Sequence, residues 1–152
     1  ALDSQYDLIL HATTEASLQE VWNELQHKER HSMLCADFNN PDAVKQFCNT
    51  LKKDFGQSLY GVINNAGITL DKPLLYQSET DIDALLQVNL KTPIQICKTA
   101  IKLFYGRQEG VIINISSCVG ETGNAFQAVY SATKAGLVAF SKSMARAIGA
   151  LL

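Results

Sequence analysis

The sequence predicts an α/β fold built on a layered sheet of parallel strands. Short apolar runs alternate along the chain with longer segments whose apolar residues recur at helical spacing. The run 111–115 (Val-Ile-Ile-Asn-Ile) is apolar on both faces, as strands are in a parallel sheet that helices cover on both sides. No repeat, low-complexity tract or linker divides the 152 residues, so we expect a single domain over 1–152.

In the first part of the chain, two strands are each followed by a helix. The apolar run 6–12 predicts a short buried strand, and the large apolar residues of 17–27 recur at helical spacing. A second strand is expected at 31–36. Asn40 and Pro41 then begin a helix that continues to Leu51, because an Asn side chain caps free amides and proline suits the first helical position.

The second part repeats this alternation. A third strand is expected at 59–63, and a long helical pattern over 80–104 follows, interrupted by Pro93. The run 111–115 predicts a fourth strand, and 129–148 predicts a last helix. Strands that alternate with helices in this way form parallel sheets.

Composition excludes several classes of function. Thirteen Lys and Arg stand against fifteen Asp and Glu, a net charge of −2, so no basic field would attract nucleic acid or an anionic membrane. No apolar run approaches the roughly 18–20 residues that span a bilayer. The beginning of the chain carries Asp3 and Asp7 and no basic region, so we expect neither a signal peptide nor secretion.

Cysteine and histidine spacing gives no indication of a metal site. The cysteines are far apart and form no Cys-x-x-Cys pair, and the histidines show no ligand spacing. We therefore expect no metal, and four buried cysteines that stay reduced. These residues are Cys35, Cys48, Cys97, Cys118, His11, His27 and His31.

The sharpest local signal is the pair Tyr130 and Lys134. On a helix, this spacing of four places both side chains on one face, one turn apart. A phenol is a poor acid or base at neutral pH, but a neighbouring ammonium stabilises its ionised form. Taken alone, the pair also suits an ordinary helix surface.

Polar residues elsewhere in the sequence are expected to lie near this pair at a ligand site. Ser116 and Ser117 follow the strand 111–115, and the carboxyl ends of strands are where open α/β sheets place ligands. A hydroxyl there could donate to a carbonyl oxygen. The segment 64–67 (Asn-Asn-Ala-Gly) ends the third strand, and Asn89 lies inside the long helix, where an amide can hold a water or a carbonyl.

Together these residues resemble the short-chain dehydrogenase/reductase family. The matching residues, in the family's order and spacing, are 64–67, Asn89, Ser117, Tyr130 and Lys134. The segments 64–69 and 114–145 are similar to the 3-oxoacyl-[acyl-carrier-protein] reductase branch in particular. The resemblance implies a doubly wound, Rossmann-like fold with three layers.

The resemblance also implies catalytic roles. Tyr130 would be the general acid that protonates a carbonyl oxygen, and Lys134 would favour its ionised form and hold the nicotinamide ribose. Ser117 would polarise the carbonyl. Asn89 would support a proton-relay water near Lys134.

Further residues match positions that hold the cofactor. Asn64, Ala66 and Gly67 would line its adenosine and ribose side, together with Tyr130 and Lys134 at the nicotinamide end. Asp37 matches the position that bonds the adenine amine, with the backbone of Phe38 beside it.

The segment that follows the first visible strand favours NADP over NAD. NAD-preferring members of the family offer an acidic residue to the ribose hydroxyls at this point. Here the chain has no acid from His11 to Thr14, and Thr13 could accept a 2′-phosphate that a carboxylate would repel.

One family feature is absent from the sequence. The turn Thr-Gly-x-x-x-Gly-x-Gly, whose amides bind the pyrophosphate, occurs nowhere in it. We therefore expect a partial domain that lacks the first, central strand between 6–12 and 59–63, and also lacks the C-terminal strands. On its own, this chain is expected to bind a dinucleotide poorly or not at all, and we do not expect it to be active by itself.

The leading hypothesis is an NADP-dependent carbonyl reductase that acts on 3-oxoacyl-[acyl-carrier-protein] in fatty acid biosynthesis. A homo-oligomer is expected for the whole protein, located in the cytoplasm or, in a eukaryote, in the mitochondrial matrix or plastid. Two alternatives stay open. One is a non-catalytic family remnant that serves as an oligomer partner, and the other is a dehydrogenase for a different alcohol or ketone.

Overall fold

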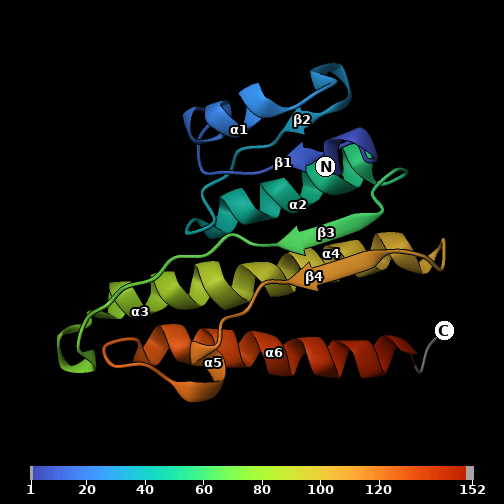
Figure 1. Ribbon diagram of the computed structural model, residues 1–152. Helices are drawn as coiled ribbons and strands as arrows, with labels where there is room; N and C mark the ends of the chain where they lie inside the picture. The colour runs from blue at the N-terminus through green and yellow to red at the C-terminus, as the bar shows by residue number, and fades with distance from the viewer. Residues whose placement is uncertain (1, 150–152) are drawn as a thin grey trace. The chain divides into compact units, whose positions relative to one another are not determined.

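The computed structural model describes residues 2–149 and confirms an α/β fold with parallel strands. The chain divides into two compact units, Ala1–Phe47 and Cys48–Leu152. Helix α2 (Pro41–Phe55) begins in the first unit and ends in the second (Figure 1).

Unit 1 contains a parallel pair of short strands, β1 (Ile9–Leu10) and β2 (Ser32–Met33). The predicted strands 6–12 and 31–36 have the right centres, and parallel backbone hydrogen bonds extend the pairing from Leu8 to Ala12. The predicted helix 17–27 is shorter than expected. It consists of a 3-10 turn (Ala16–Leu18) followed by α1 (Gln19–Glu24). Unit 1 also contains separate 3-10 turns at Leu2–Ser4 and Lys28–Arg30.

An aromatic cluster forms part of the core of unit 1. The rings of His11 and Phe38 stack with 3.8 Å between centroids, and Phe47 meets both edge-on at 5.1 Å. Burial lowers the pKa of His11, because the charged ring would lose water here. Asn40 caps α2 as expected, since its Oδ1 accepts from the backbone amides of Asp42 and Ala43.

Unit 2 is built on the parallel pair β3 (Gly61–Asn64) and β4 (Val111–Asn114), in register from Gly61↔Val111 to Asn64↔Asn114. Among the described residues, no strand ladder joins this pair to β1 and β2. Two separate two-stranded sheets agree with the expectation that a central strand is missing from this sequence.

The long pattern 80–104 forms two helices with a wider turn between them. Helix α3 (Glu79–Leu86) passes into a π-helical turn (Gln87–Lys91) and then into α4 (Thr92–Tyr105). The expected interruption at Pro93 is therefore wrong in detail. Pro93 lies at the start of α4, where its missing amide costs little, and the change of geometry comes before it.

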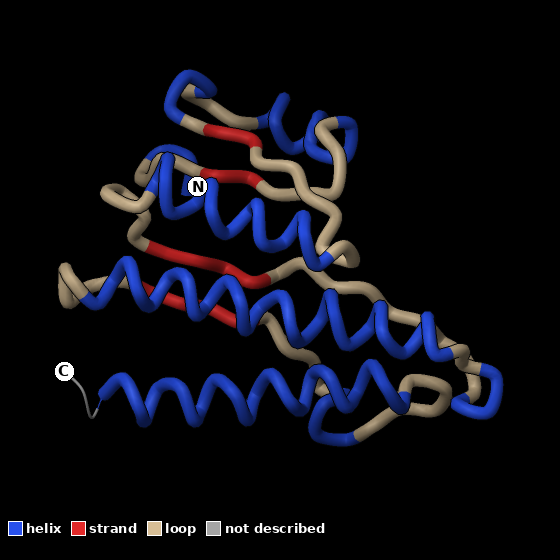
Figure 2. Tube along the Cα trace, turned by 180° about the vertical axis from the view of Figure 1, so that it is seen from behind, coloured by secondary structure: helices blue, strands red, loops and turns tan. Residues whose placement is uncertain are grey.

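The remaining elements of unit 2 complete its helical layer. A 3-10 turn (Leu74–Tyr76) precedes α3, the short helix α5 (Val119–Thr122) follows β4, and α6 (Ala128–Gly149) ends the described chain. Helix α4 covers one face of β3 and β4, behind the strands in Figure 1 and in front of them in Figure 2. Helix α6 packs against α3, α5 and the π turn.

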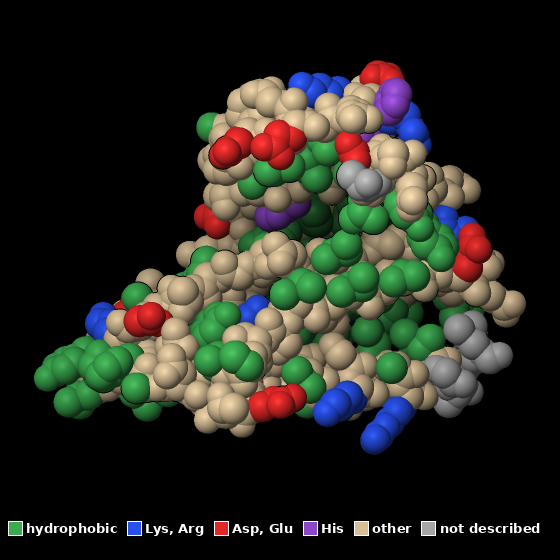
Figure 3. All heavy atoms as spheres, in the orientation of Figure 1, with side chains coloured by type: hydrophobic (Ala, Val, Ile, Leu, Met, Phe, Trp, Pro, Cys, Tyr) green, Lys and Arg blue, Asp and Glu red, His purple; other side chains and the backbone are tan. Residues whose placement is uncertain are grey.

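The opposite face of β3 and β4 is open, which corrects the expectation of burial on both sides. Side chains alternate along each strand, and the odd-numbered ones are exposed. Figure 3 shows a row of apolar side chains over these strands. The exposed apolar residues of this face are Ile63, Val111, Ile113 and Ile115.

The cysteines also differ from expectation. All four are free, but Cys118 is exposed and Cys35 is half-buried. Cys118 comes after β4, directly before α5, where the chain has left the core. Residues 2–149 contain no cluster of His, Cys, Asp or Glu that could hold a metal ion. Within the same range, no helix is both long and apolar enough to span a membrane.

Candidate active site

Helix α6 places Tyr130 and Lys134 on one face, as their spacing predicts. The Nζ atom of Lys134 lies 5.8 Å from the centroid of the Tyr130 ring. Tyr130 is half-buried in the first turn of the helix. No hydrogen bond of its hydroxyl occurs within residues 2–149.

Lys134 is fixed from the strand side. Only 5% of it is exposed, and its Nζ donates to the carbonyl of Ile115 at 2.9 Å. The Ser116 hydroxyl donates to the Lys134 carbonyl at 3.0 Å. Burial lowers the pKa of Lys134, and its ammonium keeps N–H groups beyond the one that Ile115 accepts.

Asn89 lies in the π-helical turn between α3 and α4, with 1% of it exposed. Its amide makes two hydrogen bonds of 2.8 Å with one residue, accepting from the Ile68 N–H and donating to the Ile68 carbonyl. Wide turns of this kind occur frequently at functional sites. Asn89 therefore fixes the loop after β3, and its expected role with a water stays a prediction.

Gly67 brings this loop close to the lysine. A Cβ at Gly67 would lie 3.3 Å from Asn89 Oδ1 and 3.6 Å from Lys134 Nζ, so any side chain would fill the space beside the ammonium. This space, with donors left on Lys134, suits the hydroxyls of a ribose. The structure thus brings Gly67, Asn89, Tyr130 and Lys134 together, and Ala66 is exposed beside them.

Ser117 lies in the loop between β4 and α5. Its carbonyl accepts from the Gly120 N–H at 3.0 Å, and its side chain is half-buried. Gly120 is packed against α6, since a Cβ there would lie 2.9 Å from Ala135 N and 3.0 Å from Lys134 C. This close approach, which sequence reasoning missed, holds the Ser117 loop against the turn of α6 that carries Lys134.

The Asn64 side chain points into the core of unit 2. Its Nδ2 donates to Asn114 Oδ1 at 2.8 Å and to Cys97 Sγ at 3.3 Å, and Asn114 donates to the Ser141 hydroxyl at 2.8 Å. This network ties β3 to β4, α4 and α6. A cofactor contact of Asn64, as the resemblance implies, would therefore come from its backbone.

The predicted adenine-side residues belong to unit 1. Thr13 is exposed after β1, and Asp37 is exposed after β2, where its Oδ1 accepts from the Asn39 amide at 2.9 Å. The Phe38 ring is 7% exposed in the aromatic cluster, so its backbone is the part that a ligand could reach. The roles of these residues stay predictions.

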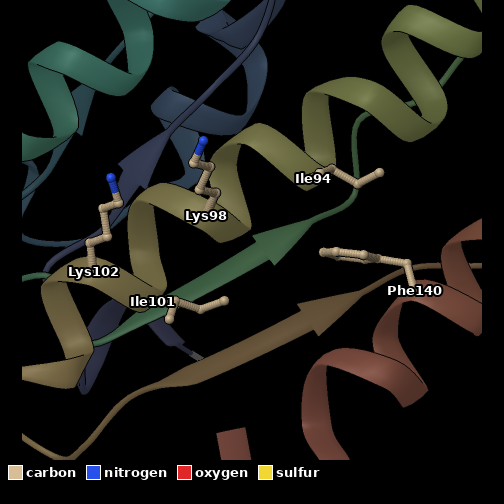
Figure 4. Close-up of a pocket in the computed structure, with 5 residues that line it drawn as sticks. All are labelled: Ile94, Lys98, Ile101, Lys102 and Phe140. Atoms are coloured by element: carbon tan, nitrogen blue, oxygen red, sulfur yellow. The ribbon is translucent and has the colours of Figure 1, made fainter. Parts of the chain in front are cut away.

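A shallow apolar hollow of about 260 Å³ lies between α4 and α6, lined by Ile94, Lys98, Ile101, Lys102 and Phe140. Figure 4 shows Ile94, Ile101 and Phe140 pointing toward the gap, and the ammonium ends of Lys98 and Lys102 pointing away from it. It has no polar group suited to carbonyl chemistry. The catalytic candidates therefore define the site, and this hollow does not.

Comparison with known families agrees with this geometry. A family described as short chain dehydrogenase matches residues 1–150. The chain belongs to the short-chain dehydrogenase family. The prediction from the motifs at 64–67, Ser117, Tyr130 and Lys134 is thereby confirmed at the level of the family.

Individual relatives of this short-chain dehydrogenase include proteins named as reductases. It is 39% identical over 118 residues to carbonyl reductase family member 4 of Xenopus laevis, covering 78% of this chain and 50% of that protein. It is 33% identical over 137 residues to the 3-oxoacyl-[acyl-carrier-protein] reductase FabG of Vibrio cholerae, covering 90% of this chain and 55% of that protein. The chain thus spans about half the length of these relatives.

A solved structure is also similar. A metagenomic short-chain oxidoreductase in complex with NADP superposes with a TM-score of 0.86 at 28% identity. The match covers 97% of this chain and 66% of that one. The Rossmann-like fold class expected from the sequence is confirmed by this likeness.

Proposed function

We propose that the complete natural protein is an NADPH-dependent carbonyl reductase whose preferred substrate is 3-oxoacyl-[acyl-carrier-protein], in fatty acid biosynthesis. The observation that carries this proposal is the Tyr130 ring, which lies on one helix face with the anchored ammonium of Lys134. Support for the substrate comes from the similarity to a 3-oxoacyl-[acyl-carrier-protein] reductase over 90% of the chain.

The roles of the side chains follow from their chemistry. The reduced nicotinamide, when bound, supplies a hydride to the carbonyl carbon. Ser117 and Tyr130 would donate hydrogen bonds to the carbonyl oxygen, and Tyr130 would then release its proton to it. The Lys134 ammonium stabilises the phenolate that remains.

The residues present suit the nucleoside parts of the cofactor. Lys134 would hold the nicotinamide ribose beside Gly67, with Ala66 and the backbone of Asn64 along the ribose side. Asp37 and the Phe38 backbone would hold the adenine. We further propose NADP rather than NAD, because Thr13 offers a hydroxyl where a carboxylate would discriminate against a 2′-phosphate.

An acid at Thr13 tests the choice of cofactor. In the complete natural protein, Thr13→Asp is expected to raise KM for NADPH about tenfold, because a carboxylate near the 2′-phosphate repels it, while KM for NADH stays the same or falls. The matched control is Thr80→Asp, which adds the same charge to the exposed first turn of α3. Strong preference of the unmodified protein for NADH would contradict the assignment.

Turnover with a panel of substrates tests the function itself. The complete natural protein should oxidise NADPH with a higher kcat/KM for 3-oxoacyl thioesters than for sugar, steroid or simple ketone substrates. A preference for one of those ketones would support the dehydrogenase of another alcohol. No turnover with any of them, in a folded protein that binds NADPH, would favour the non-catalytic oligomer partner, for which the open α4–α6 hollow offers a surface.

A further inference from the structure

Two loops beside the candidate site are joined by a pair of hydrogen bonds. One loop, 69–72, follows Ile68, and the other, 123–127, leads into α6. The Gln127 Nε2 donates to Asp71 Oδ1 at 2.6 Å, and the Lys72 N–H donates to the Phe126 carbonyl at 3.0 Å. The first bond ends on a carboxylate, so it is stronger than a bond between neutral groups.

Gln127 is held at every polar group of its side chain and marks the start of α6. Its Oε1 accepts from Asn124 Nδ2 at 3.0 Å while its Nε2 is bonded to Asp71. Its backbone carbonyl accepts from the Ser131 N–H at 2.8 Å, a bond that spans Tyr130. The position of Gln127 therefore fixes the first helical turn, which carries Tyr130.

Asp71 is in turn held by a contact within its own loop and, through Ile68, by Asn89. Its Oδ1 also accepts from the Thr69 hydroxyl at 3.2 Å. Three residues before it, Ile68 is bonded twice by the buried amide of Asn89. The contacts thus run from Asn89 to Ile68, through the loop 69–72 to Gln127, and from there to Tyr130.

Phe126 shows that the second loop is held under strain. Its φ of 66° lies in the left-handed region, which is unfavourable for a bulky residue, and its side chain is 59% exposed. Burial of the ring therefore does not explain this backbone conformation. The bond from Lys72 to the Phe126 carbonyl does hold it, and strain that surrounding contacts maintain is concentrated at functional sites.

We propose that Asp71 is a positioning residue, which acts through Gln127 to place the Tyr130 hydroxyl for proton transfer. Asp71 itself does not touch the substrate. The proposal rests on the proposed function, since it assigns Tyr130 as the proton donor.

The test compares two substitutions at Asp71 in the complete natural protein. Asp71→Ala removes the acceptor and is expected to lower kcat about tenfold to a hundredfold, with KM for NADPH unchanged, because a misplaced proton donor slows chemistry more than binding. Asp71→Asn keeps an oxygen acceptor and should retain most of the activity. Asp83→Ala, an exposed carboxylate of α3, is the matched control and should change neither constant.

Gln127 supplies a second variant that separates positioning from folding. Gln127→Ala should lower kcat as much as Asp71→Ala, and the double variant should lower it little further, because both remove the same bond. The three variants should melt within a few degrees of the wild type. Additive losses in the double variant, or kcat of Asp71→Ala within twofold of wild type, would overturn the proposal, as would Asp71→Asn as inactive as Asp71→Ala.

Hydrogen exchange distinguishes this proposal from the proposed function. The amides of 124–131 should exchange faster in Asp71→Ala than in Asp83→Ala, whatever reaction the protein performs. If the wild type reduces no carbonyl but these amides lose protection, the function fails and the link between the loops stands. Unchanged exchange in a protein that does reduce carbonyls would reject the positioning role alone.

Discussion

Replacing Tyr130 by phenylalanine in the complete natural protein is expected to lower kcat/KM for carbonyl reduction by about a hundredfold to ten-thousandfold. The change removes one hydroxyl, which makes no hydrogen bond within residues 2–149, and leaves the ring beside Lys134 in place. The fold should therefore persist, and only the proton donor is lost. Initial rates of NADPH oxidation with a 3-oxoacyl thioester measure the effect.

Tyr105→Phe is the matched control for this change. Tyr105 lies at the end of α4 with 61% of its surface exposed, so loss of its hydroxyl should alter neither activity nor the melting temperature. NADPH binding by the Tyr130→Phe variant should remain within a few-fold of wild type. Turnover by that variant close to wild type would remove Tyr130 from the mechanism.

Gly120→Ala is expected to damage both stability and activity. Its new Cβ would lie 2.9 Å from Ala135 N and 3.0 Å from Lys134 C, and the backbone of a helix cannot move aside as a flexible side chain can. We expect a loss of about 1–3 kcal/mol in the free energy of unfolding. We also expect kcat/KM to fall about tenfold or more, because α5 and the Ser117 loop must shift away from Lys134.

Gly106→Ala provides the comparison for the glycine change. A Cβ at Gly106 would meet no atom within 4 Å, and its backbone is already helical, so this variant should be as stable as wild type or slightly more so. Denaturant unfolding measures the stability of both variants, and initial rates measure their activity. Equal stability and activity of the two would show that α5 moves freely against α6.

Residue patterns predicted the parts of the fold that local chemistry determines. The helix at Pro41, the strand at 111–115 and the helix that carries Tyr130 and Lys134 depend on caps and hydrophobic periodicity within a few residues. The motif 64–67 with Ser117, Tyr130 and Lys134 indicated the family that the comparison confirms. These signals are local, so one sequence carries them.

Features that depend on distant segments could not be predicted in this way. The link between Asp71 and Gln127 joins residues 56 positions apart, and nothing in either segment indicates the other. The π turn at Asn89 resembles an ordinary helix in its pattern, because a single wide turn shifts the hydrophobic spacing only slightly. The exposure of Cys118 depends on where the chain leaves the core after β4, which composition does not show.

Transfer of deuterium tests the central claim most directly. The complete natural protein is incubated with NADPH that carries deuterium in both positions of the reactive carbon of its nicotinamide and with a 3-oxoacyl-[acyl-carrier-protein], and the product is analysed by mass spectrometry. We expect a 3-hydroxyacyl product with deuterium bound to the former carbonyl carbon, formed by wild type and nearly absent with Tyr130→Phe. A product without deuterium, or equal amounts of labelled product from both proteins in the same time, would contradict this mechanism.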